Sequence, residues 1–129
     1  MPHLSIEYSA NLEDRVDISA LCACLRQAAA DIEAFPLAGL RVRALRADHY
    51  AIADGDPKHG FVDISVRLRA GRPMEIRKAA ADVLFRAAEE FLRPYMAQHS
   101  LALSLEMRDI DPELSPKTGT IREYLGGQS

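Results

Sequence analysis

The chain opens with Met1-Pro2-His3-Leu4-Ser5-Ile6-Glu7-Tyr8, and the rest of the fold is organised around this stretch. Apolar and polar residues alternate along it, with Leu4, Ile6 and Tyr8 on one face, which predicts a half-buried β-strand. If the initiator Met1 is removed, as aminopeptidases normally do before a small residue, Pro2 carries a free secondary amine at the head of a rigid element. The alternative is that Pro2 is only a tolerated second residue, because an unusual group alone is no more than a candidate for catalysis.

Length and composition favour one globular domain spanning residues 1–129. Hydrophobic residues make up 48% and charged residues 27% of the chain, which suits a single core. The formal charge of −3 argues against nucleic acid as a partner, since binding phosphates needs a net basic surface. No apolar run reaches the length of a membrane span and no signal sequence is evident, so we expect no membrane partner and a cytoplasmic protein. Most of the cations are arginines, which favours bidentate binding of carboxylates.

The first part of the chain, residues 1–52, predicts a strand, a helix and a second strand. Asp17 is a favourable N-cap for a helix that runs to about Ala34, where Phe35-Pro36 ends it. Apolar residues recur at helical spacing between these limits. Leu40 to Ala44 alternates apolar residues with arginines, which predicts a strand that continues toward Tyr50.

Residues 60–109 predict the same succession again, after a turn-rich loop at residues 53–60. Phe61 to Arg69 alternates as a strand does. Pro73 suits the first position of a second helix, which Pro94 should kink or end. Residues 101–108 alternate once more and predict a fourth strand. Residues 110–129 follow as a tail, in which Ile121 to Leu125 form a brief helical turn.

These elements predict an α/β fold of the two-layer α+β kind, in which one βαβ unit occurs twice. We expect a four-stranded mixed sheet with both helices on one face. The other face then carries charges of both signs, which are Glu7, Arg41, Arg43, Asp63, Arg67, Arg69, Glu106 and Arg108. Such a face is either solvated or a subunit interface of paired charges, and a closed ring of identical chains would also remove exposed strand edges.

Other reactive residue types form no pattern that indicates a site. Cys22 and Cys24 are two apart on a predicted helix and point away from each other, so we expect ordinary reduced thiols. The His and Asp residues from His49 to His59 lack a recognised metal-ligand spacing, and loop polarity explains them. No Gly-rich phosphate motif and no spacing typical of a Ser-His-Asp arrangement is present. We therefore predict no metal and no cofactor.

Four motifs follow one another along the chain. They are Met1-Pro2-His3 before a strand, Phe35-Pro36-Leu37-Ala38-Gly39-Leu40-Arg41-Val42-Arg43, Ala53-Asp54-Gly55, and Ala70-Gly71-Arg72 before a helix. Together they resemble the 5-carboxymethyl-2-hydroxymuconate isomerase family of the tautomerase superfamily, over roughly residues 1 to 125. The resemblance implies a homotrimer whose sheets surround a central space, with N-terminal prolines in pockets near subunit boundaries.

The resemblance also implies which residues act. Pro2 would be the catalytic base, and Arg41 and Arg72 would bind substrate carboxylates or polarise the oxygen at carbon 2. Partial burial and nearby arginines would lower the pKa of the Pro2 amine toward neutrality, so that it could accept a proton. Pro73 stands where the family commonly has a small hydroxyl residue, which leaves the orientation of Arg72 open. The matching strand of the second unit starts at an amide nitrogen, so one site per chain is implied.

Two classes of function follow. The first is a cofactor-independent isomerase that shifts a proton along a carboxylated 2-hydroxymuconate, from dienol to unsaturated keto acid, in aromatic-compound catabolism such as homoprotocatechuate degradation. The second is a non-catalytic trimer that acts as a binding or scaffolding module. Within the first class, a tautomerase of another 2-keto acid is the further alternative.

Overall fold

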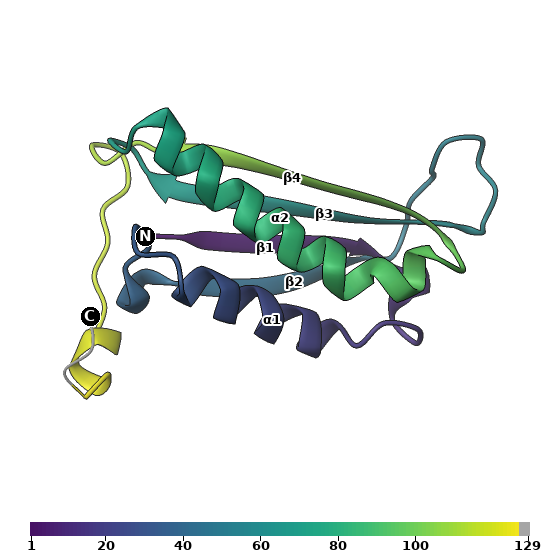
Figure 1. The fold of residues 1–129 in the computed structure, drawn as a ribbon, viewed down its shortest axis with the longest axis horizontal. Coiled ribbons are helices and arrows are strands. Elements are labelled where there is room, and N and C mark those ends of the chain that lie inside the picture. The colour runs from purple at the N-terminus through teal and green to yellow at the C-terminus, as the bar shows by residue number, and fades with distance from the viewer. Residues whose placement is uncertain (127–129) are drawn as a thin grey trace.

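The computed structural model describes residues 1–126 (Figure 1). Its strands are β1 His3–Ser9, β2 Arg41–Ala47, β3 His59–Arg69 and β4 Ser100–Ile110, and its α-helices are α1 Ile18–Ala30 and α2 Met74–Met96. Short 3-10 helices lie at Ala10–Leu12, Leu37–Gly39 and Ile121–Tyr124, and the last of these confirms the helical turn predicted for the tail. Positions 127–129 of the predicted tail lie outside the described residues.

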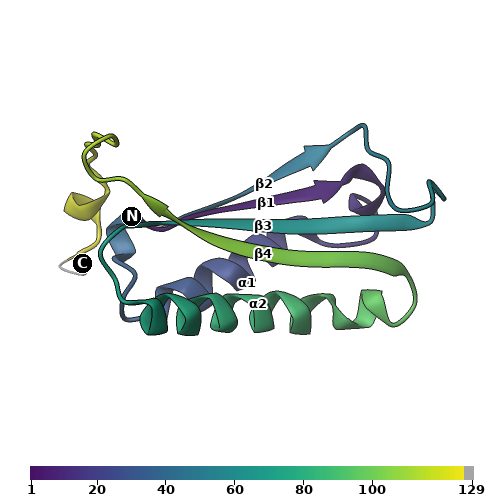
Figure 2. The ribbon, with the colours of Figure 1, turned by 90° about the horizontal axis from the view of Figure 1, so that it is seen from above.

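The four strands form one mixed sheet in the order β2-β1-β3-β4. β1 pairs with β2 in parallel, β3 pairs with β4 in parallel, and the two pairs meet where β1 runs antiparallel to β3. Each parallel pair is joined by one helix, and both helices lie on the same side of the sheet (Figure 2). The predicted α/β architecture, a duplicated βαβ unit with a two-layer arrangement, is confirmed.

The core lies between the sheet and the helices because the strand alternation and the helix periodicity place their apolar residues on facing surfaces. The large fully buried side chains include Leu4, Ile6, Val62, Ile64, Val66 and Leu68 from the sheet, and Leu21, Leu25 and Leu84 from the α-helices. Burying each such side chain contributes about 1.5–3 kcal/mol. This packing holds β1, the strand that begins at the N-terminus, at the centre of the sheet.

Two predicted ends in the first half of the chain are wrong. α1 ends at Ala30 rather than Ala34, since Asp31 is its C-cap and the chain then turns to bury Phe35 in the core. Asp17 is the N-cap as predicted, with its carboxylate accepting from the N–H of Ala20. β2 ends at Ala47 rather than near Tyr50, because its partner β1 ends at the paired residue and no further ladder is available.

The second helix also differs from the prediction. Pro73 is the N-cap, in an extended conformation, and Met74 is the first helical residue. The helix continues through Pro94 and ends at Met96. A proline this close to the helix end removes one backbone donor from the last turn and leaves the preceding turns intact. Among the helices of residues 1–126, none has both the length and the apolar character needed to cross a membrane.

The two ends of the sheet are built differently. The start of β1 and the tail meet at one end, and the loop of residues 48–58 lies at the other (Figure 1). At the start of β3, His59 Nε2 is 2.8 Å from Asp54 Oδ1 of this loop, and His59 Nδ1 is 2.6 Å from Ser100 Oγ. These contacts fasten the loop to the start of β4. Within the described part of the chain, no three His, Cys, Asp or Glu side chains are grouped to hold a metal ion.

Candidate active site

Pro2 lies directly before the central strand β1, with its side chain fully buried. The Pro2 carbonyl accepts a hydrogen bond from the N–H of Arg41 at 3.1 Å, which continues the parallel pairing of β1 with β2. Gly39 also lies close to the first two residues. A Cβ placed there would lie 3.1 Å from Met1 Cα and 3.6 Å from Pro2 Cδ, so this position favours the absence of a side chain. The backbone around Pro2 is therefore held by the segment that leads into β2.

The amine of Met1 stands in a positively charged environment. Its pKa is lowered from 8.0 to about 6, first by partial burial and then by nearby cations. In order of effect, these cations are Lys117, Arg72, Arg69 and Arg41. An amine with such a pKa is largely neutral at pH 7 and can accept a proton.

His3 keeps Arg41 beside the N-terminus. The two residues are register partners across β1 and β2, and Arg41 Nη1 lies 3.2 Å from His3 Nε2. Partial burial, followed by Arg67, Arg41 and Arg43, lowers the pKa of His3, which favours the neutral ring. His3 Nδ1 also lies 3.4 Å from Arg43 Nη1. A neutral imidazole has one acceptor nitrogen, so only one of these two arginines can donate a hydrogen bond to it at a time.

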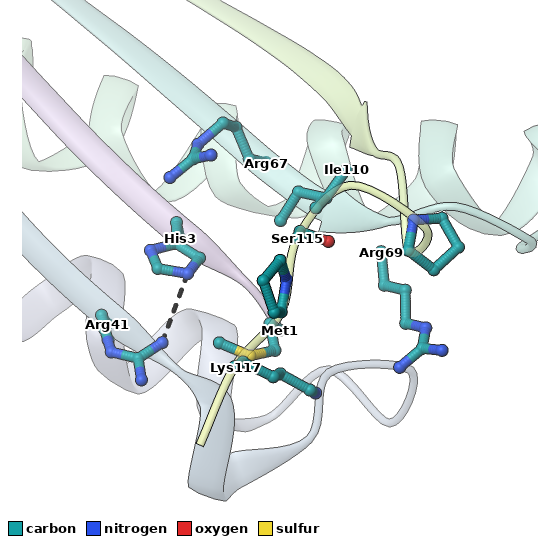
Figure 3. A pocket seen from close by; sticks show the side chains of 10 residues that line it. Met1, His3, Arg41, Arg67, Arg69, Ile110, Ser115 and Lys117 are labelled. Atoms are coloured by element: carbon teal, nitrogen blue, oxygen red, sulfur yellow. Dashed lines mark hydrogen bonds between the residues drawn. The ribbon is translucent and has the colours of Figure 1, made fainter. Parts of the chain in front are cut away.

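A cavity of about 230 Å³ opens above Met1 (Figure 3). It is lined by Met1 and by residues from all four strands and the tail, which are His3, Arg41, Arg67, Arg69, Ile110, Pro112, Ser115, Pro116 and Lys117. Among residues 1–126, the cavity is lined by arginines and a lysine and by no Asp or Glu. A second hollow of about 340 Å³ adjoins the first and shares Met1, Arg41 and Lys117 with it. The combined site suits a small anion with several negative groups.

The structure brings two of the three predicted site residues together and places the third apart from the cavity. Pro2 and Arg41 are neighbours through the pairing of β1 with β2. Arg72 is turned toward the backbone instead. Its Nε and Nη2 donate to the carbonyl of Ala34 at 3.1 and 2.8 Å, and its Nη1 donates to the carbonyl of Arg69 at 3.1 Å. Arg72 does not line either hollow beside Met1, although its charge acts on the Met1 amine.

Sequence reasoning missed the contribution of the tail. Residues 112–117 close one side of the cavity, yet nothing in their composition indicated a site. Arg67 and Arg69 were predicted only as members of the charged sheet face, and the structure shows that they also line the cavity. The single signal available for them was the alternation of β3, which places both on the same face as His3.

The fold is that of the tautomerase superfamily. A fused 4-OT protein, solved as a symmetric trimer, superposes with a TM-score of 0.65 over 91% of this chain and 92% of that chain, at 22% identity. The crystal structure of a 5-carboxymethyl-2-hydroxymuconate delta-isomerase superposes with a TM-score of 0.91 over 100% of this chain and 95% of that one, at 29% identity.

The sequence comparisons are more specific. The family profile of 5-carboxymethyl-2-hydroxymuconate isomerase matches residues 2–125. The 5-carboxymethyl-2-hydroxymuconate Delta-isomerase of Escherichia coli is 32% identical over 121 residues, covering 94% of this chain and 96% of that protein. The chain therefore belongs to the 5-carboxymethyl-2-hydroxymuconate isomerase family, and the resemblance stated from its motifs is confirmed.

Proposed function

We propose that this protein is a cofactor-independent isomerase of a carboxylated 2-hydroxymuconate, with Pro2 as its general base after removal of Met1. The observation that carries the proposal is the buried Pro2, which directly follows Met1 in a cavity whose charged lining groups are cations. Met1 lines both hollows beside it. Removal of Met1 would take away a residue that both hollows share and would leave the Pro2 nitrogen as a free amine.

The reaction needs only a proton carrier and an anion site. The hydroxyl at carbon 2 of the dienol loses its proton and becomes a carbonyl. The two double bonds, between carbons 2 and 3 and between carbons 4 and 5, become one between carbons 3 and 4. A proton is then added at carbon 5. The neutral Pro2 amine takes up the first proton and delivers one in the second step, which is typically worth about 10²–10⁴-fold in rate.

Arg41 is proposed to bind the carboxylate attached to carbon 2 and the oxygen on carbon 2. Its guanidinium is held beside the N-terminus by His3 and by the Gly39 carbonyl, which Arg41 Nη1 approaches to 3.4 Å. Negative charge develops on the substrate during proton transfer, and a fixed cation there lowers the barrier. We propose that Arg72 assists by its charge, which lowers the pKa of the N-terminal amine, while its N–H donors hold the backbone of Ala34 and Arg69.

We also propose a homotrimer. The sheet face opposite the helices supports it, because Glu7, Arg43, Asp63 and Arg67 are exposed there in one chain and could pair across subunits. The trimeric state of the fused 4-OT protein, which has the same fold, is in line with this proposal. Neighbouring chains would then close the open sides of the cavity. Light scattering should give a mass three times that of one chain, and a monomer at working concentration would count against the proposal.

The test of the proposed function combines mass and activity. Intact mass should show the loss of Met1, and the dienol absorbance should decay rapidly with the purified protein. Pro2→Ala should lower kcat by about 10²-fold or more, since it removes the fixed secondary amine. Pro57→Ala, in the loop at the opposite end of the sheet, should leave activity unchanged. Undiminished turnover by Pro2→Ala would refute the mechanism, and absence of turnover by the wild type on any 2-hydroxydienoate would favour a non-catalytic trimer.

A further inference from the structure

The cavity contains more cations than the proposed chemistry has used. Arg41 is assigned to the end of the substrate that reacts, and Arg67, Arg69 and Lys117 remain. Arg67 and Arg69 extend from β3 on the open sheet face, where charges of a neighbouring chain would be available to them in the proposed trimer. Lys117 is different because it comes from the tail and not from the sheet.

The tail is folded so that Lys117 reaches the N-terminus. After β4, the N–H of Glu113 donates to Asp111 Oδ1 at 2.9 Å, and Ser115 Oγ donates to the Asp111 carbonyl at 2.6 Å. These contacts form a turn, and Pro112 and Pro116 on either side restrict the backbone. The tail then passes alongside the start of β1 (Figure 1).

The position and contacts of Lys117 suit a residue that binds an anion. It lines both hollows, and in Figure 3 it lies with Arg69 on the side of Met1 away from Arg41 and His3. Within residues 1–126, its ammonium group makes no hydrogen bond or ion pair with another side chain. Of all the cations, it has the largest effect in lowering the pKa of the Met1 amine. A long, flexible ammonium side chain of this kind acts as a mobile point charge.

We propose that Lys117 is a specificity-determining residue that binds the carboxylate of the carboxymethyl branch of the substrate, on the side of the N-terminus opposite Arg41. This inference rests on the proposed function. A muconate that carries a carboxymethyl group has three carboxylates, and each of them needs a cationic partner when it leaves water. A cationic site built for the third carboxylate discriminates against the same dienol without the branch, because the cation is then left without its partner.

The experiment compares two dienols, 5-carboxymethyl-2-hydroxymuconate and 2-hydroxymuconate, which lacks the branch. Lys117→Met should lower kcat/KM for the branched dienol roughly five- to tenfold, the range between an exposed ion pair and a hydrogen bond to a charged group. Measured well above the pKa of the amine, where the base is neutral in both proteins, the same variant should change kcat/KM for the unbranched dienol by less than about twofold. Lys117→Arg should retain most of the activity on the branched dienol, since it keeps the charge.

The matched control is Lys58→Met, which removes the same charge from the loop at the opposite end of the molecule. It should leave both kcat/KM values unchanged, so that an effect of net charge is separated from an effect at the cavity. An equal loss on both dienols by Lys117→Met, or no loss on either, would overturn the assignment. If the wild type turns over neither dienol, the proposed function itself fails. Turnover by the wild type without a selective effect of Lys117→Met refutes this inference alone.

Discussion

Arg72 should contribute to stability in a way that Arg41 does not. Its guanidinium donates to two backbone carbonyls, those of Ala34 and Arg69, and so ties the segment after α1 to the segment after β3. Replacing it in Arg72→Gln removes these bonds and leaves a partly buried carbonyl without its donor. Arg41, by contrast, contacts His3 and approaches the Gly39 carbonyl only to 3.4 Å.

The size of the effect follows from the number of contacts. A hydrogen bond from a charged donor contributes about 1.5–3 kcal/mol when buried, and a half-exposed arginine should contribute at the low end of this range. Losing the hydrogen bonds to both carbonyls should then lower the free energy of unfolding of Arg72→Gln by about 2–3 kcal/mol. Arg41→Gln should lose less than about 1 kcal/mol, as surface contacts usually do.

Urea denaturation provides the measurement, at one fixed protein concentration because assembly stabilises the folded chain by mass action. With a slope of about 1–3 kcal/mol per molar urea, Arg72→Gln should lower the midpoint by roughly 1 M or more. Arg86→Gln, an exposed arginine on α2, is the control and should leave the midpoint in place. If Arg72→Gln unfolds at the wild-type midpoint, the structural role inferred for its guanidinium is wrong.

Three further predictions concern the base, its surroundings and the core. Activity should rise with pH as the Pro2 amine loses its proton, and Lys117→Met should move this rise to higher pH, because removing a nearby cation raises the pKa of the amine; a shift to lower pH in the profile of kcat/KM would contradict this. Gly39→Val should lower kcat by about tenfold or more and cost about 1–3 kcal/mol in unfolding free energy, since a Cβ would already be in van der Waals contact with Pro2 Cδ at 3.6 Å and the two methyl groups of Val extend beyond it; wild-type kinetics in this variant would show that Pro2 is not confined. Leu84→Ala should cost about 2–5 kcal/mol by urea denaturation, as it empties a fully buried site under the sheet, and a loss below about 1 kcal/mol would mean that the helix repacks.

The fold could be predicted because its elements carry strong local patterns. β3 alternates without a break, and the buried members of the alternation are those that the pattern placed on the core face. The ends of elements were less predictable. β2 stops where its partner stops, and α1 unwinds early so that Phe35 can be buried, and both events depend on residues distant in the chain. Propensity near a helix or strand end is weak compared with such contacts.

The candidate site was only partly predictable, for a related reason. Pro2 and Arg41 are far apart in sequence, and the family's motifs indicate both as site residues, while only the structure shows that they are neighbours. Lys117 was not marked, because the turn after β4 that brings it to the N-terminus leaves no periodic signal. Arg72 was marked as a ligand, while its contacts with the carbonyls of Ala34 and Arg69 come from chain crossings that a pattern does not reveal.

From residues alone, the alternation of strands, the helical spacing and the duplicated unit determine a two-layer sheet, and the head of its first strand presents Pro2 as a possible base. These features follow from local periodicity, which decides the face on which each side chain lies. Tertiary structure alone decided which cations surround that base. Arg67 and Arg69 line the cavity together with the tail, and Lys117 reaches it from the other end of the sequence, because charge accumulates in space through long-range packing and not along the chain.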